Sequence, residues 1–195
     1  MILLPAVAIG LLTGLGWARW RSQPYQPPAL RYFWLAFAAF LPQFLAVYLP
    51  PLRGQVSERV AALCLLVSQI LFLGFVWLNR RLAGVNILML GLLLNLAVMT
   101  TNGGFMPIAP QTASRLVPAQ VLANIQSGSR FGIKDILLPP QDTRLEWLAD
   151  RFLPPAWFPY QAAFSLGDIL IAVGAFWLLA RQSSSFGITS KGETT

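Results

Sequence analysis

The sequence predicts an all-α fold, a polytopic membrane bundle of five transmembrane helices with one long outer loop. Three observations favour it. Of the 195 residues, 56% are hydrophobic and 11% are charged, whereas a soluble globular domain carries about a quarter charged residues. Apolar runs recur at the length that crosses a bilayer core of about 30 Å. Most of the cations stand beside those runs, as is typical of membrane proteins.

Five apolar runs, each bounded by charge or proline, are predicted to span the membrane. They cover Ile2–Trp17, Tyr32–Leu49, Val60–Leu78, Leu82–Thr101 and Ala162–Ala180. The first run could also be a secretory signal. No basic residue precedes it and Arg19 and Arg21 follow it, so an uncleaved span is favoured. Residues 1–181 then form one transmembrane bundle, and residues 182–195 form a polar tail.

The positions of the cations predict the orientation. Three arginines and no acid stand between the first two spans, two arginines stand in the turn between the third and fourth, and the tail holds Arg181 and Lys191. Because cytoplasmic loops carry the excess of Lys and Arg, we expect the N-terminus outside and the C-terminus in the cytoplasm. The net charge of +7 is then a topology signal. Nucleic-acid binding is not expected, since the cations are spread over several loops.

The outer loop, residues 102–161, is predicted to hold one or two short helices that lie in the membrane interface. Asp142 can cap a helix over Thr143–Leu153, in which apolar residues recur at helical spacing. A weaker amphipathic stretch covers Ala113–Ile125. Prolines divide the remainder into rigid extended pieces, so we expect the loop to pack on the bundle. The loop also carries most of the acids, namely Asp135, Asp142, Glu146 and Asp150.

Small residues recur in every predicted span at offsets of three, four or seven, which places them on one helical face. Small residues let transmembrane helices approach closely. The glycines expected at helix contacts are Gly10, Gly14, Gly84, Gly91, Gly167 and Gly174.

Polar residues within the spans predict an intramembrane polar cluster. Gln43, Asn95 and Asp168 each lie about six residues from the outer end of their span, roughly 9 Å deep. Asp168 is the only ionisable residue in any predicted span, and such a residue is expected to face the interior of the bundle. No basic partner is expected at that depth, so Asp168 is either protonated or bonded to donors such as Asn95 and Ser165. Asn102 would extend the cluster toward the loop. The cluster either fixes helix register or handles protons.

The composition excludes several kinds of chemistry. Histidine is absent, which removes imidazole acid–base catalysis and the commonest metal and haem ligand. Cys64 is the single cysteine and can form neither an intrachain disulfide nor a thiolate cluster. We therefore predict no metal site and no dedicated cofactor. The spans are rich in Phe and Trp, which could face lipid, quinone or pigment tails, although interface belts and lipid-facing packing are the favoured explanation.

Two motifs stand out along the chain. The sequence NGGFMP occupies residues 102–107 after the fourth span, and FSLGD occupies residues 164–168 at the start of the last. With these motifs and with TRLEWLAD at residues 143–150, the chain resembles an uncharacterised bacterial family of small integral-membrane proteins, a domain of unknown function. The resemblance implies a multi-span protein of the bacterial inner membrane, with no known activity.

Residues 164–174 are also similar to the last-helix motif of lipoprotein signal peptidase, a membrane aspartyl protease. Residues 94–97 are similar to the start of that family's other catalytic motif, but the aspartate of that motif has no match near Val98 and Met99. An aspartyl dyad needs two carboxylates close together. Hydrolysis is therefore expected only if a loop acid, Asp135, Asp142 or Asp150, folds back to Asp168.

Two functions of different classes remain. The leading hypothesis is a non-catalytic structural or accessory subunit of a membrane complex, such as an electron-transfer or photosynthetic assembly, with membrane lipids and other membrane subunits as partners. The alternative is a membrane aspartyl hydrolase that uses Asp168 and an outer-loop carboxylate. A carrier or channel is disfavoured, because the spans hold one ionisable group and no pair of broken helices.

Overall fold

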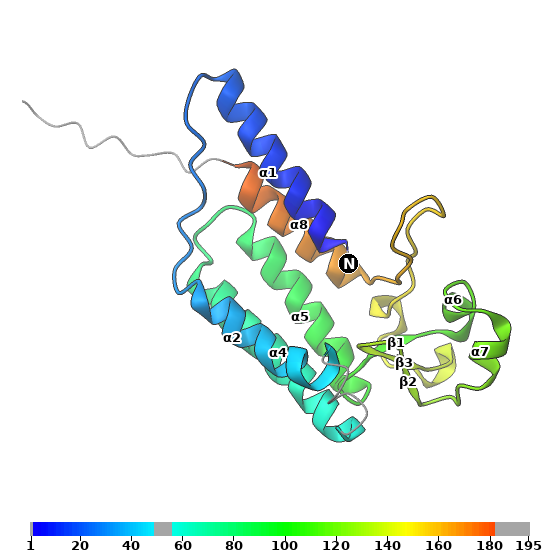
Figure 1. The fold of residues 1–195 in the computed structure, drawn as a ribbon. Coiled ribbons are helices and arrows are strands. Elements are labelled where there is room, and N and C mark those ends of the chain that lie inside the picture. Colours follow the sequence, from blue (N-terminus) through cyan, green and yellow to red (C-terminus); the bar gives the residue numbers. More distant parts are fainter. Residues whose placement is uncertain (1, 49–55, 182–195) are drawn as a thin grey trace, which may run out of the picture.

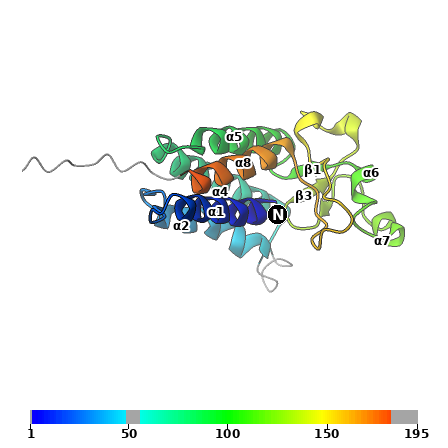
Figure 2. The ribbon, with the colours of Figure 1, turned by 90° about the horizontal axis from the view of Figure 1, so that it is seen from above.

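The computed structural model of the chain describes residues 2–48 and 56–181. Five apolar helices lie side by side, and residues 102–165 form a cap at one end of them (Figure 1). Seen from above, the helices occupy one side of the molecule and the cap the other (Figure 2). The helices are α1 (Leu3–Trp20), α2 (Trp34–Gln43), α4 (Glu58–Leu78), α5 (Val85–Thr101) and α8 (Leu166–Ala180).

The helices form a row in the order α1, α8, α5, α4, α2, because each contacts mainly its neighbours in that order. Helices α1 and α8 run in the same direction, since Gly10 lies against Phe176 and Gly14 against Leu179. Helices α5 and α8 run in opposite directions, because Gly91 faces Gly167. We call this arrangement the helix row.

Hydrogen bonds between side chain and backbone set the position of α2 against α4. The backbone N–H of Arg31 donates to Asn79 Oδ1 at 2.7 Å, and the backbone N–H of Gln43 donates to Ser68 Oγ at 3.1 Å. The two helices are therefore antiparallel. As a result, the C-terminal ends of α1, α4 and α8 and the N-terminal ends of α2 and α5 lie together at the end of the row that is far from the cap (Figure 1).

The cap is built around a small mixed sheet in the order β1-β3-β2. Strand β1 pairs in parallel with β3, with Met106 opposite Asp135, and β2 pairs antiparallel to β3. Strand β3 is the central strand of this sheet, and all three residues of β1 are buried because β1 is also covered by the Ile108–Asp150 bridge. The cap elements are β1 (Met106–Ile108), α6 (Pro110–Ala113), α7 (Ala119–Ala123), β2 (Arg130–Phe131), β3 (Asp135–Leu137), and the 3-10 turns η2 (Pro140–Asp142) and η3 (Glu146–Leu148).

The prediction of an all-α fold with five transmembrane helices is wrong. The cap contains a sheet, and of the helices in the described ranges only α1 and α4 are long and apolar enough to cross a membrane. Helices α5 and α8 have 17 and 15 residues. At about 1.5 Å per residue they extend roughly 25 and 22 Å, which is short of a hydrocarbon core of about 30 Å.

The second, fourth and fifth apolar runs are longer than their α-helices because apolar residues also occupy other backbone conformations, whereas α1 and α4 extend beyond the first and third runs. In the fifth run, Phe164 forms an antiparallel bridge with Phe152, and α8 begins only after Ser165. The fourth run begins in a turn, where Gly84 has a φ of 80°. In the second run, Pro42 lies inside α2 and a π-helix, η1 (Phe44–Tyr48), follows. The predicted end of that run at Leu49, and the predicted tail at residues 182–195, lie outside the described residues.

The predicted interfacial helices are also shorter in the structure. Residues 143–153 hold only the 3-10 turn η3, because Leu145 has a φ of 54° and Asp150 forms a parallel bridge with Ile108. The stretch Ala113–Ile125 holds the end of α6 and the five-residue helix α7. Pairing of Asp150 with β1 thus keeps part of residues 143–153 in an extended conformation, although their periodicity predicted a helix.

Candidate functional site

A polar cluster lies where α5, α8 and the cap meet. Asn95 Nδ2 donates to Asp168 Oδ1 at 2.8 Å, and Ser165 Oγ donates to Asn95 Oδ1 at 3.0 Å. Ser165 and Asp168 also form a capping box at the start of α8: Ser165 Oγ accepts from the backbone N–H of Asp168 at 3.0 Å, while Asp168 Oδ2 accepts from that of Ser165 at 3.4 Å. Capping satisfies backbone N–H groups that a helix start leaves open. The cluster therefore orders the first turn of α8.

Lys134 of the cap supplies a cation that the sequence analysis did not expect here. Its Nζ lies 2.5 Å from Asp150 Oδ2, 3.3 Å from Asp135 Oδ1 and 4.0 Å from Asp168 Oδ2. Three carboxylates from separate parts of the chain thus surround one ammonium. The backbone N–H of Met106 donates to the carbonyl of Lys134, so pairing with β1 fixes the position of the Lys134 backbone. We call Asn95, Lys134, Asp135, Asp150, Ser165 and Asp168 the Lys134 cluster.

Burial controls the protonation of the loop acids in this cluster. The Asp150 side chain is 0% exposed, and burial raises its pKa well above the ordinary range, although the nearby ammonium opposes this. Burial also raises the pKa of Asp135. For Lys134, burial acts to lower the pKa, but the charges of the three carboxylates outweigh it, so the pKa is raised well above that of a free lysine. The ammonium therefore stays protonated at neutral pH.

Two of the acids are close enough to share a proton. The carboxyl of Asp135 lies within hydrogen-bonding reach of that of Asp150, and among the residues that the structure describes neither Asp135 Oδ1 nor Asp150 Oδ1, both buried, has a hydrogen-bond partner. A buried polar atom without a partner is costly. A proton held by one of the two carboxyls removes that cost and also reduces the repulsion between them.

The other residues expected at the polar site lie elsewhere. Gln43 is on α2, separated from α8 by α4 and α5 in the helix row. Asn102 is buried and binds the cap: its Nδ2 donates to the carbonyls of Val98 and Arg144, and its Oδ1 accepts from the backbone N–H of Arg144 at 2.9 Å. Asp142 is exposed on η2. The structure thus brings together Asn95, Ser165 and Asp168 and leaves Gln43 and Asn102 in separate contacts.

Sequence reasoning missed Lys134, and the signal for it is weak. It is one of two lysines in the chain, and it stands directly before the acid Asp135 in an otherwise apolar stretch. A lone cation beside an acid is usually a solvated pair. Only the pairing of β1 with β3 brings it beside Asp150 and Asp168.

The glycines of the predicted helix contacts lie where helices α5, α8 and α1 approach. A Cβ at Gly91 would lie 2.5 Å from the carbonyl oxygen of Gly167, and a Cβ at Gly167 would overlap Asn95 Oδ1. Gly84 and Gly174 face one another in the same way, and Gly10 and Gly14 lie against the backbone of α8. The close approach of α5 and α8 is what allows Asn95 to reach Asp168.

Charge and tryptophan are distributed unevenly between the two ends of the molecule. Within the described ranges, six acids and six cations lie in the cap or at the cap end of a helix, so their charges balance. The far end of the helix row holds no described acid and carries six arginines, namely Arg19, Arg21, Arg31, Arg80, Arg81 and Arg181. Five of the seven tryptophans lie near the basic end, all of them exposed: Trp17, Trp20, Trp34, Trp77 and Trp177. Tryptophan and arginine together are typical of helix ends at a membrane surface. Over the part of the chain that the structure describes, no group of His, Cys, Asp and Glu is placed to hold a metal ion.

Comparison with known proteins identifies a family. None of the curated proteins and none of the solved structures matches the chain, so the likeness to lipoprotein signal peptidase has no support beyond the motif. A model of the family of unknown function DUF5317 matches residues 28–180, a stretch that includes the whole cap and four of the five helices in the row. The chain therefore belongs to the DUF5317 family.

Proposed function

We propose that this protein resides in a membrane and acts there as a non-catalytic structural or accessory subunit of a larger membrane assembly. The observation that carries the proposal is the apolar exterior of the helix row. Every helix of the row exposes large apolar side chains, for example Leu12, Phe37, Leu63, Leu90 and Val173. A soluble protein rarely leaves so large an apolar surface open to water.

The shape of the helix row supports partners in addition to lipid. In the row, each inner helix contacts mainly two neighbours and each end helix mainly one, so two broad faces stay uncovered. A closed bundle would instead bury one side of every helix. Helices α1 and α4 meet the length and hydropathy that a membrane span needs. The shorter helices need flanking protein or a thinned bilayer to be accommodated. The uncovered faces suit lipid, quinone or pigment tails and the helices of other subunits.

The orientation follows from the uneven distribution of charge. With the basic end in the cytoplasm, the N-terminus and the cap lie outside, in agreement with the positive-inside rule. The six arginines of the far end stand at helix ends and in short connections, where the rule counts them, whereas most of the six described cations of the cap end lie within the long segment 102–165.

The Lys134 cluster fits a structural role within this proposal. Its ammonium neutralises the carboxylates that a hydrolase would need free, and it joins the cap to α8. Buried charge networks are a known means of fixing one arrangement of elements. The cluster would thus hold the cap in one position on the helix row.

Thiol labelling tests residence and orientation together. In a Cys64→Ala background, single cysteines replace Gln141 in the cap and Arg81 at the basic end, both exposed. We expect the protein to stay in membranes washed with alkaline carbonate. An impermeant maleimide should label position 141 in intact spheroplasts and position 81 only after permeabilisation. Release by carbonate would contradict membrane residence, and the reverse labelling would contradict the orientation.

Purification under mild detergent tests the accessory role. We expect the protein from native membranes to migrate with at least one other membrane protein in fixed stoichiometry. A chain that always migrates alone would count against an accessory subunit, while leaving membrane residence intact.

A second candidate function, a membrane aspartyl hydrolase, is favoured by one observation. Asp168 and two loop carboxylates converge on the same ammonium, as that hypothesis requires of at least one loop acid. The test measures cleavage of a quenched fluorescent lipopeptide by the wild type and by Asp168→Asn, with Asp142→Asn as the exposed control. A hydrolase should lose at least 100-fold in rate in Asp168→Asn alone, with unchanged melting. Equal signals in all three proteins would exclude this activity on that substrate.

A further inference from the structure

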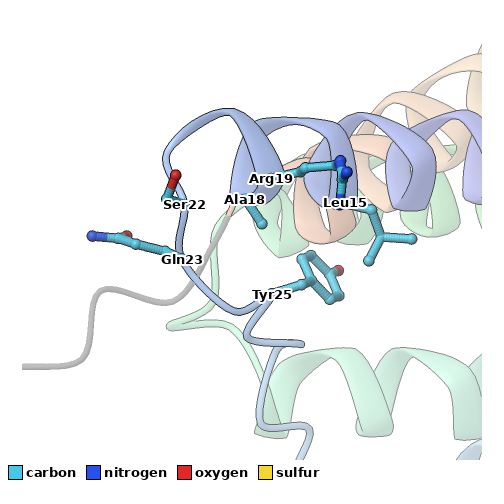
Figure 3. A pocket seen from close by; sticks show the side chains of 6 residues that line it. All are labelled: Leu15, Ala18, Arg19, Ser22, Gln23 and Tyr25. Atoms are coloured by element: carbon cyan, nitrogen blue, oxygen red, sulfur yellow. The ribbon is translucent and has the colours of Figure 1, made fainter.

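The loop that follows α1 turns back along the helix and leaves a groove of about 780 Å³ beside it (Figure 3). The turn is made at Ser22, which has a φ of 53°, and the backbone N–H of Gln23 donates to the carbonyl of Ala18 at 2.9 Å. The groove is lined by Leu15, Ala18, Arg19, Ser22, Gln23 and Tyr25.

Tyr25 fixes the wall of this groove. Its ring lies over Gly14, where a Cβ would stand 2.7 Å from Cε2, and its Oη donates to the carbonyl of Leu179 on α8 at 2.8 Å. Burial raises the pKa of Tyr25, so the hydroxyl remains a donor across the physiological range. The returning loop is thereby held against both α1 and α8.

The lining of the groove is apolar toward the middle of the helix and polar toward its end. Leu15 and Ala18 come from the last two turns of α1, whereas Ser22 and Gln23 stand at the turn, as Figure 3 shows. Arg19 lies between the two regions, with its side chain near Leu15 and Tyr25. None of the ion pairs formed within residues 2–48 and 56–181 involves Arg19. Its guanidinium is therefore available to an anion.

We propose that this groove binds the headgroup of an anionic phospholipid. Arg19 would bind the phosphate, Ser22 and Gln23 would donate hydrogen bonds to the headgroup oxygens, and an acyl chain would lie along Leu15. Arginine binds phosphate oxygens through two parallel hydrogen bonds. Basic pockets at the cytoplasmic end of membrane helices suit anionic headgroups. The proposal rests on the membrane residence and orientation proposed above.

The surroundings of the groove favour an anionic lipid over a zwitterionic one. Arg21, which stacks over Trp17 at 4.7 Å, and Arg181 at the end of α8 belong to the same basic end, and no described acid lies there to offset them. The amine of a zwitterionic headgroup would meet this positive surface. The apolar part of the groove favours a lipid over a free phosphate, because an acyl chain can contact Leu15 and Ala18 whereas a free phosphate has no apolar group to do so.

Native mass spectrometry of the full-length protein in detergent tests the proposal, with phosphatidylglycerol and phosphatidylcholine of identical acyl chains as probes. We expect the wild type to retain phosphatidylglycerol preferentially. Arg19→Gln should lower that affinity about tenfold, since it removes a charge-assisted contact. Arg81→Gln is the matched control, because Arg81 is exposed at the same end and lies outside the groove. It should change the affinity less than twofold.

The contrary outcomes are distinct. Equal losses in Arg19→Gln and Arg81→Gln would assign the preference to general surface charge and overturn the site. Competition by soluble glycerol phosphate at the concentration of the lipid would assign the groove to a free phosphate ester and also overturn the lipid proposal. A protein that stays in carbonate-washed membranes but shows no headgroup preference would refute the groove alone. Release by carbonate would instead refute the proposed function.

Discussion

Lys134 Nζ lies 2.5 Å from Asp150 Oδ2, and this ion pair joins two segments of the cap beside the start of α8. The two residues stand on separate segments of the cap, and each is held by pairing with β1: the carbonyl of Lys134 accepts from Met106, and the backbone N–H of Asp150 donates to the carbonyl of Pro107. Asp168 of α8 lies 4.0 Å from the same ammonium. The charge of Lys134 therefore joins three parts of the fold.

Replacement of Lys134 by methionine should destabilise the protein strongly. Asp150 has a side chain exposure of 0%, so it would remain buried without its cation. Removing one partner of a buried pair typically costs about 3 to 5 kcal/mol. Since the Lys134 side chain is 34% exposed, we expect the lower value in thermal unfolding in detergent. Lys134→Met/Asp150→Asn should recover part of the loss, and exposed Arg115→Gln should change stability little. If Lys134→Met left the stability unchanged, the ion pair would not be what holds the cap.

Stability should fall as the pH rises above the ordinary carboxyl range. Because burial raises the pKa of Asp150, the folded protein keeps a proton that the unfolded chain has released above about pH 4. The free energy of unfolding therefore decreases from that pH up to the raised pKa. Lys134 acts differently: its pKa is also raised, so its contribution persists at neutral pH and is lost only above the ordinary range of lysine.

Unfolding curves recorded from pH 4 to pH 8 check this dependence. The wild type should lose stability across that range, and Asp150→Asn should show a flatter profile because it cannot bind the proton. Parallel profiles for the two proteins would contradict a raised pKa at Asp150.

Gly91→Ala should separate α5 from α8. The new methyl group would meet the carbonyl oxygen of Gly167 at 2.5 Å and the backbone nitrogen of Ile171 at 2.8 Å, neither of which can move alone. Overpacking of this kind costs about 1 to 3 kcal/mol. Gly74→Ala on α4 is the matched control, because nothing lies within 4 Å of its Cβ position. It should raise stability by up to about 1 kcal/mol through helix propensity. Equal thermal shifts in both variants would show that α5 and α8 are not in close contact.

Asn102→Ala should loosen the cap segment around Arg144. Asn102 is buried and makes hydrogen bonds of 2.7, 2.8 and 2.9 Å to the backbone of Val98 and Arg144. Truncation leaves these groups without a partner, at a cost of about 1 to 3 kcal/mol. Hydrogen exchange at the Arg144 amide should accelerate accordingly. Asn124→Ala removes an exposed amide on a short helix, and it should leave that exchange rate unchanged. An unchanged exchange rate in Asn102→Ala would show that these hydrogen bonds do not hold the segment around Arg144.

Hydropathy located the helices of this protein but not their ends. Each predicted apolar run overlaps one helix of the row, because a helix satisfies the backbone hydrogen bonds of an apolar segment internally. The runs overestimated the lengths of α5 and α8, which begin only after the positive φ of Gly84 and the Phe152–Phe164 bridge, and the length of α2, which gives way to the π-helix η1 after Gln43. Average hydropathy does not register these interruptions, and the count of five spans failed for that reason.

The residues of the polar site likewise fall into those that the sequence could assign to it and those that it could not. Ser165 and Asp168 are three residues apart, so the capping box is local and can be read from the order of residues. Asn95 joins them because the glycines of α5 and α8 lie at matching spacing. Lys134, Asp135 and Asp150 could not be assigned to the site, since their places depend on the pairing of β1 with β3 and with Asp150.

The sequence by itself determined that this chain is far more apolar than a soluble domain, roughly where its long helices lie, and that arginines stand in the short connections between them. These properties depend on composition and on neighbours along the chain. Only the tertiary structure decided that the cap contains a sheet, that three aspartates surround Lys134, and that a loop closes a groove beside Arg19. Contacts between residues far apart in the sequence create these features, so no local pattern records them.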